Sequence, residues 1–331
     1  MRDVAERAGV SITSVSHVIN ETRPVSDELR QRVLDAMDEL GYQPNRLARS
    51  LRRGRTRTIG LIIPDSANPF FAEVARGIED TSFEHDYNVI LCNSEGSPAK
   101  ERMYVDVLTA KQVDGILFVA GEVIPERIEK LLARETPVVV VDREVPGLDI
   151  DTVLTDNAKG GYLATRHLVE LGHRRIACIA GPSTATPSAA RVDGYVEALG
   201  EVGLERDNDL ICRGDFQYGG GYRMAQELLG LVPQPTAIFA CNDLMAVGAL
   251  RAAAERGLEV PEDLSIVGFD DVQLASYTIP PLTTIAQPKY EIGTTAAEML
   301  LSHIKDSKSE GERRVLPTRL VVRKSTGERR R

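Results

Sequence analysis

The sequence has no tryptophan, only four cysteines among its 331 residues, and no long apolar run. A membrane-spanning helix needs about 20 apolar residues, so no membrane segment is expected. The cysteines form neither a C-x-x-C metal motif nor a disulfide framework, and most of them lie in apolar runs. The first residues carry no apolar stretch of the kind a signal peptide has. These absences predict a protein of the reducing cytoplasm.

The usual signatures of catalytic and cofactor sites are also missing. The five histidines form no pair at i, i+4 spacing, and neither G-x-x-x-x-G-K-[ST] nor G-x-G-x-x-G occurs. The run Gly219-Gly220-Gly221 is a candidate phosphate-binding loop, but it is better interpreted as a flexible start of the helix that follows Phe216. No nucleophile–base pair stands out. We therefore expect no enzyme, no cofactor and no metal site.

The composition is that of a globular protein of about two domains, with 42% apolar and 27% charged residues. The net charge of −9 argues at first sight against nucleic acid, but it is unevenly distributed. Residues 1–58 hold eleven arginines, no lysine and eight acids, which leaves this segment at +3 and the remainder at −12. Residues 45–57 carry six arginines and no acid. Such a run is either a solvated linker or a contact with nucleic acid.

The arginine run follows a predicted helix-turn-helix. A first helix ends at Gly9, Ser11 caps a second, and Ser26 caps a third over 27–40. The second helix buries Val15, Val18 and Ile19 and leaves short groups for base edges, namely Ile12, Thr13, Ser14, Ser16 and His17. The third has a predicted core face of Leu29, Val33, Leu34, Met37 and Leu40. A small bundle that binds protein is the alternative, and the arginines weigh against it.

From residue 58 onward short apolar runs alternate with helical patterns. Strands are predicted at 58–64, 88–92, 115–119, 138–141, 175–180, 237–241, 264–269 and 282–286, and helices at 70–84, 98–111, 158–171 and 244–256. This alternation predicts an α/β fold of doubly wound parallel sheets. Such sheets bind ligands beyond the carboxyl ends of their strands.

Polar and aromatic side chains gather after those strand ends. Arg191 is predicted to open a helix after the loop 181–188, and the other polar candidates follow strands directly or by short loops. The polar candidates are Asn68, Asp142, Arg143, Arg191, Asn242, Asp270 and Gln287, and the aromatic ones are Phe70, Phe71 and Phe216. The polar groups can grip adjacent hydroxyls of a polyol, and the rings can pack on its C–H faces. Each Asp or Asn alone is read equally well as a helix cap.

The N-terminal segment resembles the headpiece of the lactose/galactose-repressor (LacI) family. The match is carried by Asp3-Val4-Ala5, Ala8-Gly9-Val10-Ser11, the run from Thr13 to Asn20, Gly41-Tyr42-Gln43-Pro44-Asn45, and a hinge-helix segment from Asn45 to Leu51. The family usually has several residues before Asp-Val-Ala, where only two stand here. The resemblance implies DNA contacts by Ser11, Ile12, Thr13, Ser16, His17, Asn20, Asn45, Arg46, Ala48, Leu51 and Arg52. Leu51 would be the wedge that enters the minor groove.

The remainder resembles the periplasmic sugar-binding fold that this family uses as a sensor. The ten candidates above, in segments such as Asn68-Pro69-Phe70-Phe71 and Asp142-Arg143, match the pocket pattern of the ribose-binding protein. The Thr13 and His17 pair is more similar to the purine and ribose branches than to the lactose branch. The purine branch has a tryptophan where Arg143 stands. The resemblance therefore implies D-ribose as effector, with another pentose, a hexose or a purine as alternatives.

The expected organisation has three parts: a headpiece at 1–44, a hinge at 45–57 and a sensing core at 58–331. The core divides into an N-lobe at 58–156 with 287–318 and a C-lobe at 157–286 with 319–331. No leucine heptad follows residue 318, so a homodimer on palindromic operator DNA is expected. The expected function is a sugar-responsive transcriptional repressor. The alternatives are a transport receptor and a catabolite-control regulator whose effector is a partner protein.

Overall fold

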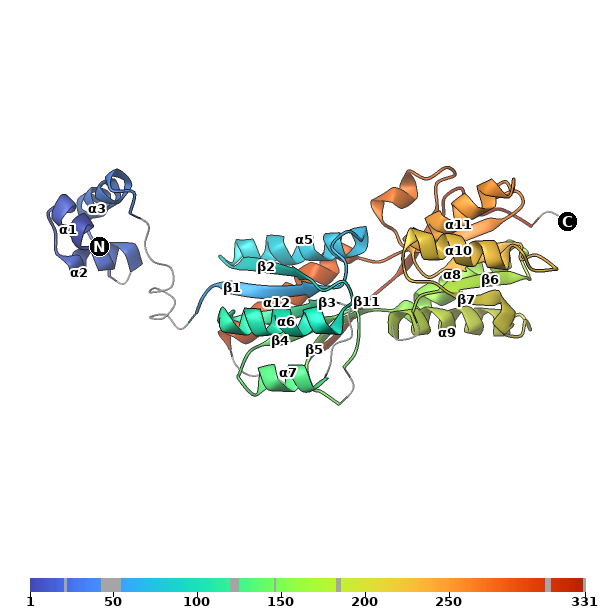
Figure 1. The fold of residues 1–331 in the computed structure, drawn as a ribbon, viewed down its shortest axis with the longest axis horizontal. Helices are drawn as coiled ribbons and strands as arrows, with labels where there is room; N and C mark the ends of the chain where they lie inside the picture. The colour runs from blue at the N-terminus through green and yellow to red at the C-terminus, as the bar shows by residue number, and fades with distance from the viewer. Residues whose placement is uncertain are drawn as a thin grey trace. The chain divides into compact units, whose positions relative to one another are not determined.

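The computed structural model divides into two compact units, Met1–Arg57 and Thr58–Arg331 (Figure 1). The structure describes residues 1–20, 23–42, 55–119, 125–145, 147–182, 186–306 and 311–329. Each unit has its own apolar core, and each is described by itself below.

The first unit contains three helices, α1 (Arg2–Ala8), α2 (Ile12–Asn20) and α3 (Asp27–Glu39). Gly9 ends α1 in the left-handed conformation at φ 64°, which glycine adopts without strain. The Ser11 hydroxyl accepts a hydrogen bond from the Ser14 amide at 3.0 Å. Ser26 does the same for the Leu29 amide at 3.3 Å. These two caps set the starts of α2 and α3, as the sequence predicts.

The core of this unit is small. Its buried residues are Val4, Ala5, Ala8, Val15, Val18, Val33 and Ala36. The prediction of the core face was wrong for Leu34 of α3 and for Leu40, which directly follows α3, because they are 41% and 46% exposed. The apolar arc of α3 is wider than the surface that two short helices can cover, so its edges face solvent.

The second unit is built from two sheets. We call the first sheet with its helices the N-lobe. Its strand order is β11-β5-β4-β3-β1-β2, all parallel. The strands are β1 (Thr58–Ile63), β2 (Asn88–Asn93), β3 (Gly115–Val119), β4 (Val138–Val141), β5 (Asp151–Thr155) and β11 (Arg313–Leu316). The helices are α5 (Pro69–Glu84), α6 (Pro98–Ala110), α7 (Pro125–Leu132) and α12 (Lys289–Lys305).

Helices cover both faces of the N-lobe sheet (Figure 1). Along β3, Leu117 and Val119 pack toward α5 and α12, whereas Ile116 and Phe118 pack toward α6 and α7. Successive side chains of a strand point to opposite faces, so a strand covered on both sides must be apolar throughout. This explains why the strand runs in the sequence are continuous rather than alternating.

The C-lobe has the strand order β12-β10-β9-β8-β6-β7. Its strands are β6 (Ile176–Ala180), β7 (Ile211–Arg213), β8 (Ala237–Ala240), β9 (Ser265–Asp270), β10 (Thr283–Ala286) and β12 (Arg319–Val321). Its helices are α8 (Asn157–Glu170), α9 (Thr186–Gly200), α10 (Tyr218–Leu228) and α11 (Asp243–Glu255), with short 3₁₀ turns η1 (Asn208–Leu210) and η2 (Gln273–Ser276). The strands are parallel except β12, which pairs antiparallel with β10.

The chain passes from one sheet to the other three times. These passages lie between β5 and α8, between β10 and α12, and between β11 and β12. We call them the first, second and third crossovers. Both sheets thus present the carboxyl ends of their parallel strands to the loops next to the crossovers, where such sheets bind ligands.

Candidate functional site

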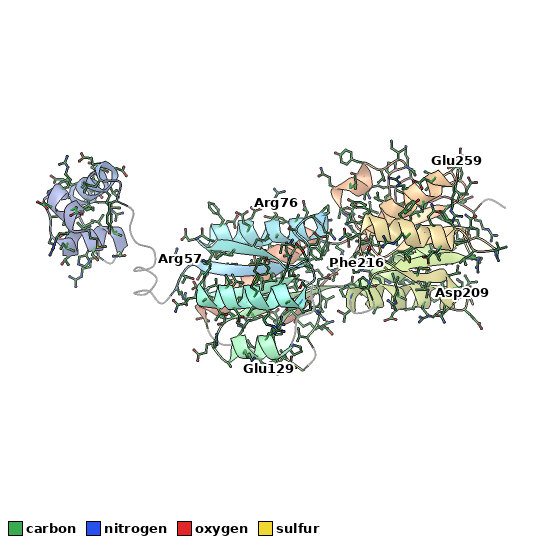
Figure 2. All side chains as sticks on the ribbon, viewed as in Figure 1. Arg57, Arg76, Glu129, Asp209, Phe216 and Glu259 are labelled. Atoms are coloured by element: carbon green, nitrogen blue, oxygen red, sulfur yellow. The ribbon has the colours of Figure 1, made fainter. Side chains whose placement is uncertain are left out.

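A cavity of about 630 Å³ lies at the strand ends of both lobes. Nine of the ten residues predicted to bind the effector line it: Asn68, Phe70, Phe71, Asp142, Arg143, Arg191, Phe216, Asn242 and Asp270. Gln287 is not among the described lining residues. Figure 2 labels Phe216, which directly precedes the loop into α10 on the side of the C-lobe that faces the N-lobe. The cavity has the size of an ordinary small-molecule site. We call it the cleft.

Arg191 is the buried cation of the cleft, with 3% of its surface exposed. Its Nε donates to Oδ1 of Asn157 at 2.8 Å and its Nη1 donates to the Cys241 carbonyl at 2.5 Å. The guanidinium lies 3.8 Å from the centre of the Phe269 ring, and Nη1 lies 3.7 Å from Oδ1 of Asp270. Hydrogen bonds and the ring together fix its orientation.

Arg191 does not open a helix after residue 188, as the sequence suggested. It is the sixth residue of α9, which begins at Thr186. The close approach of α8 to α9 sets its position, because a Cβ on Gly161 would lie 2.0 Å from the Arg191 carbonyl oxygen. Only glycine allows this packing distance.

Asp142 and Asp270 are the buried acids of the cleft, one from each lobe. Burial raises the pKa of each to about 6, although the positive charge of Arg191 opposes that rise. Oδ1 of Asp142 is buried and has no hydrogen-bond partner within the described part of the chain. A buried carboxylate oxygen without a donor is costly, so this atom is suited to accept a hydrogen bond from a ligand.

Asn68 and Asn242 act as helix caps and also line the cleft. Oδ1 of Asn68 accepts from the Phe70 amide at 3.0 Å at the start of α5. Oδ1 of Asn242 accepts from the Met245 amide at 2.9 Å at the start of α11, and its Nδ2 donates to the Phe216 carbonyl at 3.0 Å. The simpler interpretation of these two residues as caps therefore holds alongside their place in the cleft.

Three phenylalanines form the apolar part of the cleft. The rings of Phe70 and Phe71 meet edge to face, with 5.2 Å between their centres. Phe216 has a φ of 63°, a left-handed backbone that is rare for a bulky residue. Backbone strain of this kind persists where the surrounding structure holds a residue in place. Here it places the Phe216 ring in the lining of the cleft.

Gln287 lies on the second crossover, next to Asp270. Its Nε2 donates to Oδ1 of Asp270 at 2.7 Å, and its Oε1 accepts from the Thr155 hydroxyl at 2.6 Å. In this conformation it supports the cleft carboxylate and ties it to the end of β5.

Five further polar residues that line the cleft were not predicted from the sequence: Asp65, Glu95, Thr186, Asp215 and Gln217. Nε2 of Gln217 donates to Oδ2 of Asp65 at 2.9 Å, a hydrogen bond that joins the C-lobe to the N-lobe. Asp65 follows β1 closely, so the strand-end rule could have found it. Gln217 has no such signal in the sequence.

The predicted DNA-contact residues that the structure describes lie at or on α2. Ser11, Ile12 and Thr13 are exposed, and Ser16 and His17 are half-buried. Asn20 is buried, and its Nδ2 donates to the Ser16 carbonyl at 2.8 Å. The five predicted hinge contacts, Asn45, Arg46, Ala48, Leu51 and Arg52, lie outside the described residues.

Two family models match the chain. Residues 1–45 match bacterial regulatory proteins of the lacI family, and residues 165–326 match the periplasmic binding protein-like domain. The HTH-type transcriptional repressor PurR of Aliivibrio salmonicida is 40% identical over 326 residues, 98% of each chain. PurR of Photobacterium profundum is 40% identical over 328 residues, again 98% of each chain.

The chain belongs to the LacI family. It is a DNA-binding transcriptional repressor with a small-molecule effector, and not an enzyme.

Solved structures of LacI-family regulators are also similar to this repressor. The lac repressor dimer bound to operator and the anti-inducer ONPF is 32% identical, with a TM-score of 0.87 and 98% of each chain covered. A LacI family regulator from Enterococcus faecium with bound ribose is 37% identical, with a TM-score of 0.76, over 82% of this chain and 100% of that chain. Among the described residues, no helix is long and apolar enough to span a membrane.

Proposed function

We propose that this repressor binds a palindromic operator as a homodimer and that D-ribose, bound in the cleft, lowers its affinity for that operator. It would do so in the cytoplasm, where the chromosomal DNA lies. Closure of the two lobes on the sugar changes the hinge segment 45–57, so that the predicted Leu51 wedges no longer fit the minor groove. Only a ligand that binds the two states with different affinities can shift the balance in this way.

The observation that carries the ribose proposal is the buried Oδ1 of Asp142, which has no donor in the described part of the chain. A sugar hydroxyl supplies that donor. Arg143 and Arg191 can donate to further hydroxyl oxygens, and Asp270 can accept from another hydroxyl. A small cavity lined by both carboxylates and guanidinium groups suits a neutral polyol, because each hydroxyl can donate to a carboxylate and accept from a guanidinium.

A purine base is the second candidate effector. It is favoured by the 40% identity to the two repressors named PurR. Its ring N–H groups would also satisfy Asp142. Ribose remains the first choice, since the cleft has two arginines and the sequence has no tryptophan to stack on a base.

On the DNA side, we propose that α2 lies in the major groove. Ile12 and Thr13 are exposed at its N-terminal end, the end of a recognition helix that reaches base edges. His17 follows one turn later. The arginines of 45–57 would neutralise phosphates on either side of Leu51.

The homodimer proposal rests on large apolar side chains that the single chain leaves in solvent. In the C-lobe, Val232, Tyr277 and Ile279 are 97%, 72% and 96% exposed. In the N-lobe, Leu91 and Met103 are about half exposed. Exposed apolar surface of this kind is typical of protein interfaces. A dimer would present two α2 helices to the two half-sites of a palindrome.

Calorimetric titration of the full chain tests the effector. D-ribose, D-xylose, D-glucose and hypoxanthine are each titrated into the protein, and saturable heat is expected with D-ribose alone. Heat with hypoxanthine alone would move the assignment to the purine. Heat with none of the four would contradict a small sugar or purine effector and favour a partner protein.

A further inference from the structure

Asn157 is a buried amide beside the cleft that the sequence analysis left out. It is the first residue of α8, directly after the first crossover, and 7% of its surface is exposed. It is not among the described residues that line the cleft. The sequence pattern predicts a helix from residue 158, one residue after the observed start of α8.

The side chain of Asn157 contacts the buried cation of the cleft and the end of β5. Its Oδ1 accepts from Nε of Arg191, on α9 of the C-lobe, at 2.8 Å. Its Nδ2 donates to the Thr155 carbonyl at 3.2 Å, at the end of β5. Asp142, which follows β4 in the N-lobe, lies near enough for the Asn157 amide to lower the pKa of its carboxylate.

Helix capping does not account for this arrangement. The cap of α8 is Asp156, whose Oδ1 accepts from the Lys159 amide at 2.9 Å. The amide offers an acceptor to the Arg191 guanidinium and a donor to the Thr155 carbonyl at the same time. An aspartate in its place keeps the acceptor but loses the donors.

We infer that Asn157 is a positioning residue of the effector site: it holds Arg191 in the orientation in which Arg191 and Asp142 can grip one ligand, and it ties that orientation to the first crossover. This inference rests on the proposed function, because it takes the effector to bind between those two side chains. Asn157 acts through them and does not touch the effector itself.

The pH dependence of binding separates positioning from mere support of the fold. Burial raises the pKa of Asp142, and the nearby charge of Asp270 raises it further. Arg191, Asn157 and Arg143 each lower it. Removal of the amide should therefore raise the pKa of Asp142 further. If the ionised carboxylate is the form that accepts from the effector, the affinity for the effector falls as the solution is acidified. In the variant without the amide this fall should begin at a higher pH than in the wild type.

The first experiment titrates D-ribose into the full-length wild type and three variants between pH 5 and pH 8. Asn157→Ala should bind D-ribose at least about tenfold more weakly at pH 7.5. The fall of its D-ribose affinity at acid pH, which we call the acid limb, should be displaced to higher pH. Asn157→Asp should bind more weakly still, because it sets a second negative charge beside Asp142. Thr165→Val is the matched control: it removes a buried hydroxyl on α8 that donates to the Gly161 carbonyl, and Thr165 is not among the described residues that line the cleft. Wild-type affinity and an unmoved acid limb in Asn157→Ala would overturn the inference.

The second experiment needs no ligand. Carboxyl-carbon NMR follows the titration of aspartates in the wild type, and Asp142→Asn identifies the Asp142 signal by its loss. Its midpoint should lie near pH 6 in the wild type and higher in Asn157→Ala, while Thr165→Val leaves it in place. An unchanged midpoint in Asn157→Ala would overturn the positioning role. A wild type that does not bind D-ribose would overturn the ribose assignment alone, because the NMR titration still decides on Asn157.

Discussion

The headpiece and the cleft carry their candidate functional residues in opposite ways. In the headpiece, Ile12 and Thr13 are exposed on one short helix above a small apolar core. In the cleft, Asp142, Arg191 and Asp270 are more than nine-tenths buried, and they come from distant parts of the chain. The two regions also differ in charge, at +3 for residues 1–58 and −12 for the remainder.

This difference follows from the ligands that the two regions are proposed to hold. DNA is a large polyanion, and an exposed helix with nearby arginines can read it without burying charge. A small polyol must be enclosed, so the groups that bind it are taken out of water and must support one another. Mutations should therefore act locally in the headpiece and through networks in the cleft.

The largest expected effect is on the cleft side. Arg143→Ala should weaken D-ribose binding by about 3 kcal/mol, roughly a hundredfold, because it removes a charged donor from the enclosed ligand. Operator affinity without sugar should stay unchanged. Arg251→Ala, which removes an exposed arginine paired with Glu255 on α11, is the control. Calorimetry and operator titration measure both quantities, and a parallel loss of sugar and operator binding would break the separation of the two regions.

A smaller effect is expected on the DNA side. His17→Ala should cost roughly 1–3 kcal/mol at one base pair of the operator and leave D-ribose affinity unaltered. Fluorescence anisotropy with a set of operators, each changed at one base pair, measures the loss of discrimination. If the variant keeps the full preference at every position, His17 does not read a base.

The smallest expected effect is on stability, and its sign sharpens the contrast. Asp142 has a pKa of about 6 in the folded protein, above its ordinary value of 3.8. A group whose pKa is raised on folding stabilises the fold below pH 4 relative to pH 7, and that stability is lost as the pH rises through 6. Asp142→Asn should therefore be about 1–2 kcal/mol more stable than the wild type at pH 7, with no gain at pH 4. Urea unfolding at both pH values checks this, and an equal gain at both would contradict a charge effect.

Much of the fold could be predicted because its signals are local. The buried strands β1, β3 and β4 are continuous apolar runs, and the caps Ser11 and Ser26 stand where α2 and α3 begin. Two of the edge strands, β7 and β11, were not predicted. β7 is only half-buried, and β11 reads Arg-Arg-Val-Leu with mostly exposed side chains, so neither shows an apolar pattern.

The cleft could be predicted only as a set of strand-end residues. The rule that ligands bind beyond strand ends, together with the resemblance to the ribose-binding protein, identified nine lining residues. It could not show that Gln287 bonds Thr155, 132 positions away, or that Gln217 reaches Asp65 across 152 positions. These pairs depend on how the crossovers bring the lobes together, and no local pattern encodes them. The place of Asn157 beside the cleft could not be predicted for the same reason.

The most direct test of the account is operator binding by the full chain with and without D-ribose. Fluorescence anisotropy with a palindromic operator is measured at fixed salt, because phosphate contacts make DNA affinity strongly salt-dependent. The account predicts that saturating D-ribose weakens operator binding at least about tenfold, a coupling of about 1.4 kcal/mol, and that Arg143→Ala abolishes this response. Unchanged operator affinity in a wild type shown to be saturated with D-ribose would contradict it.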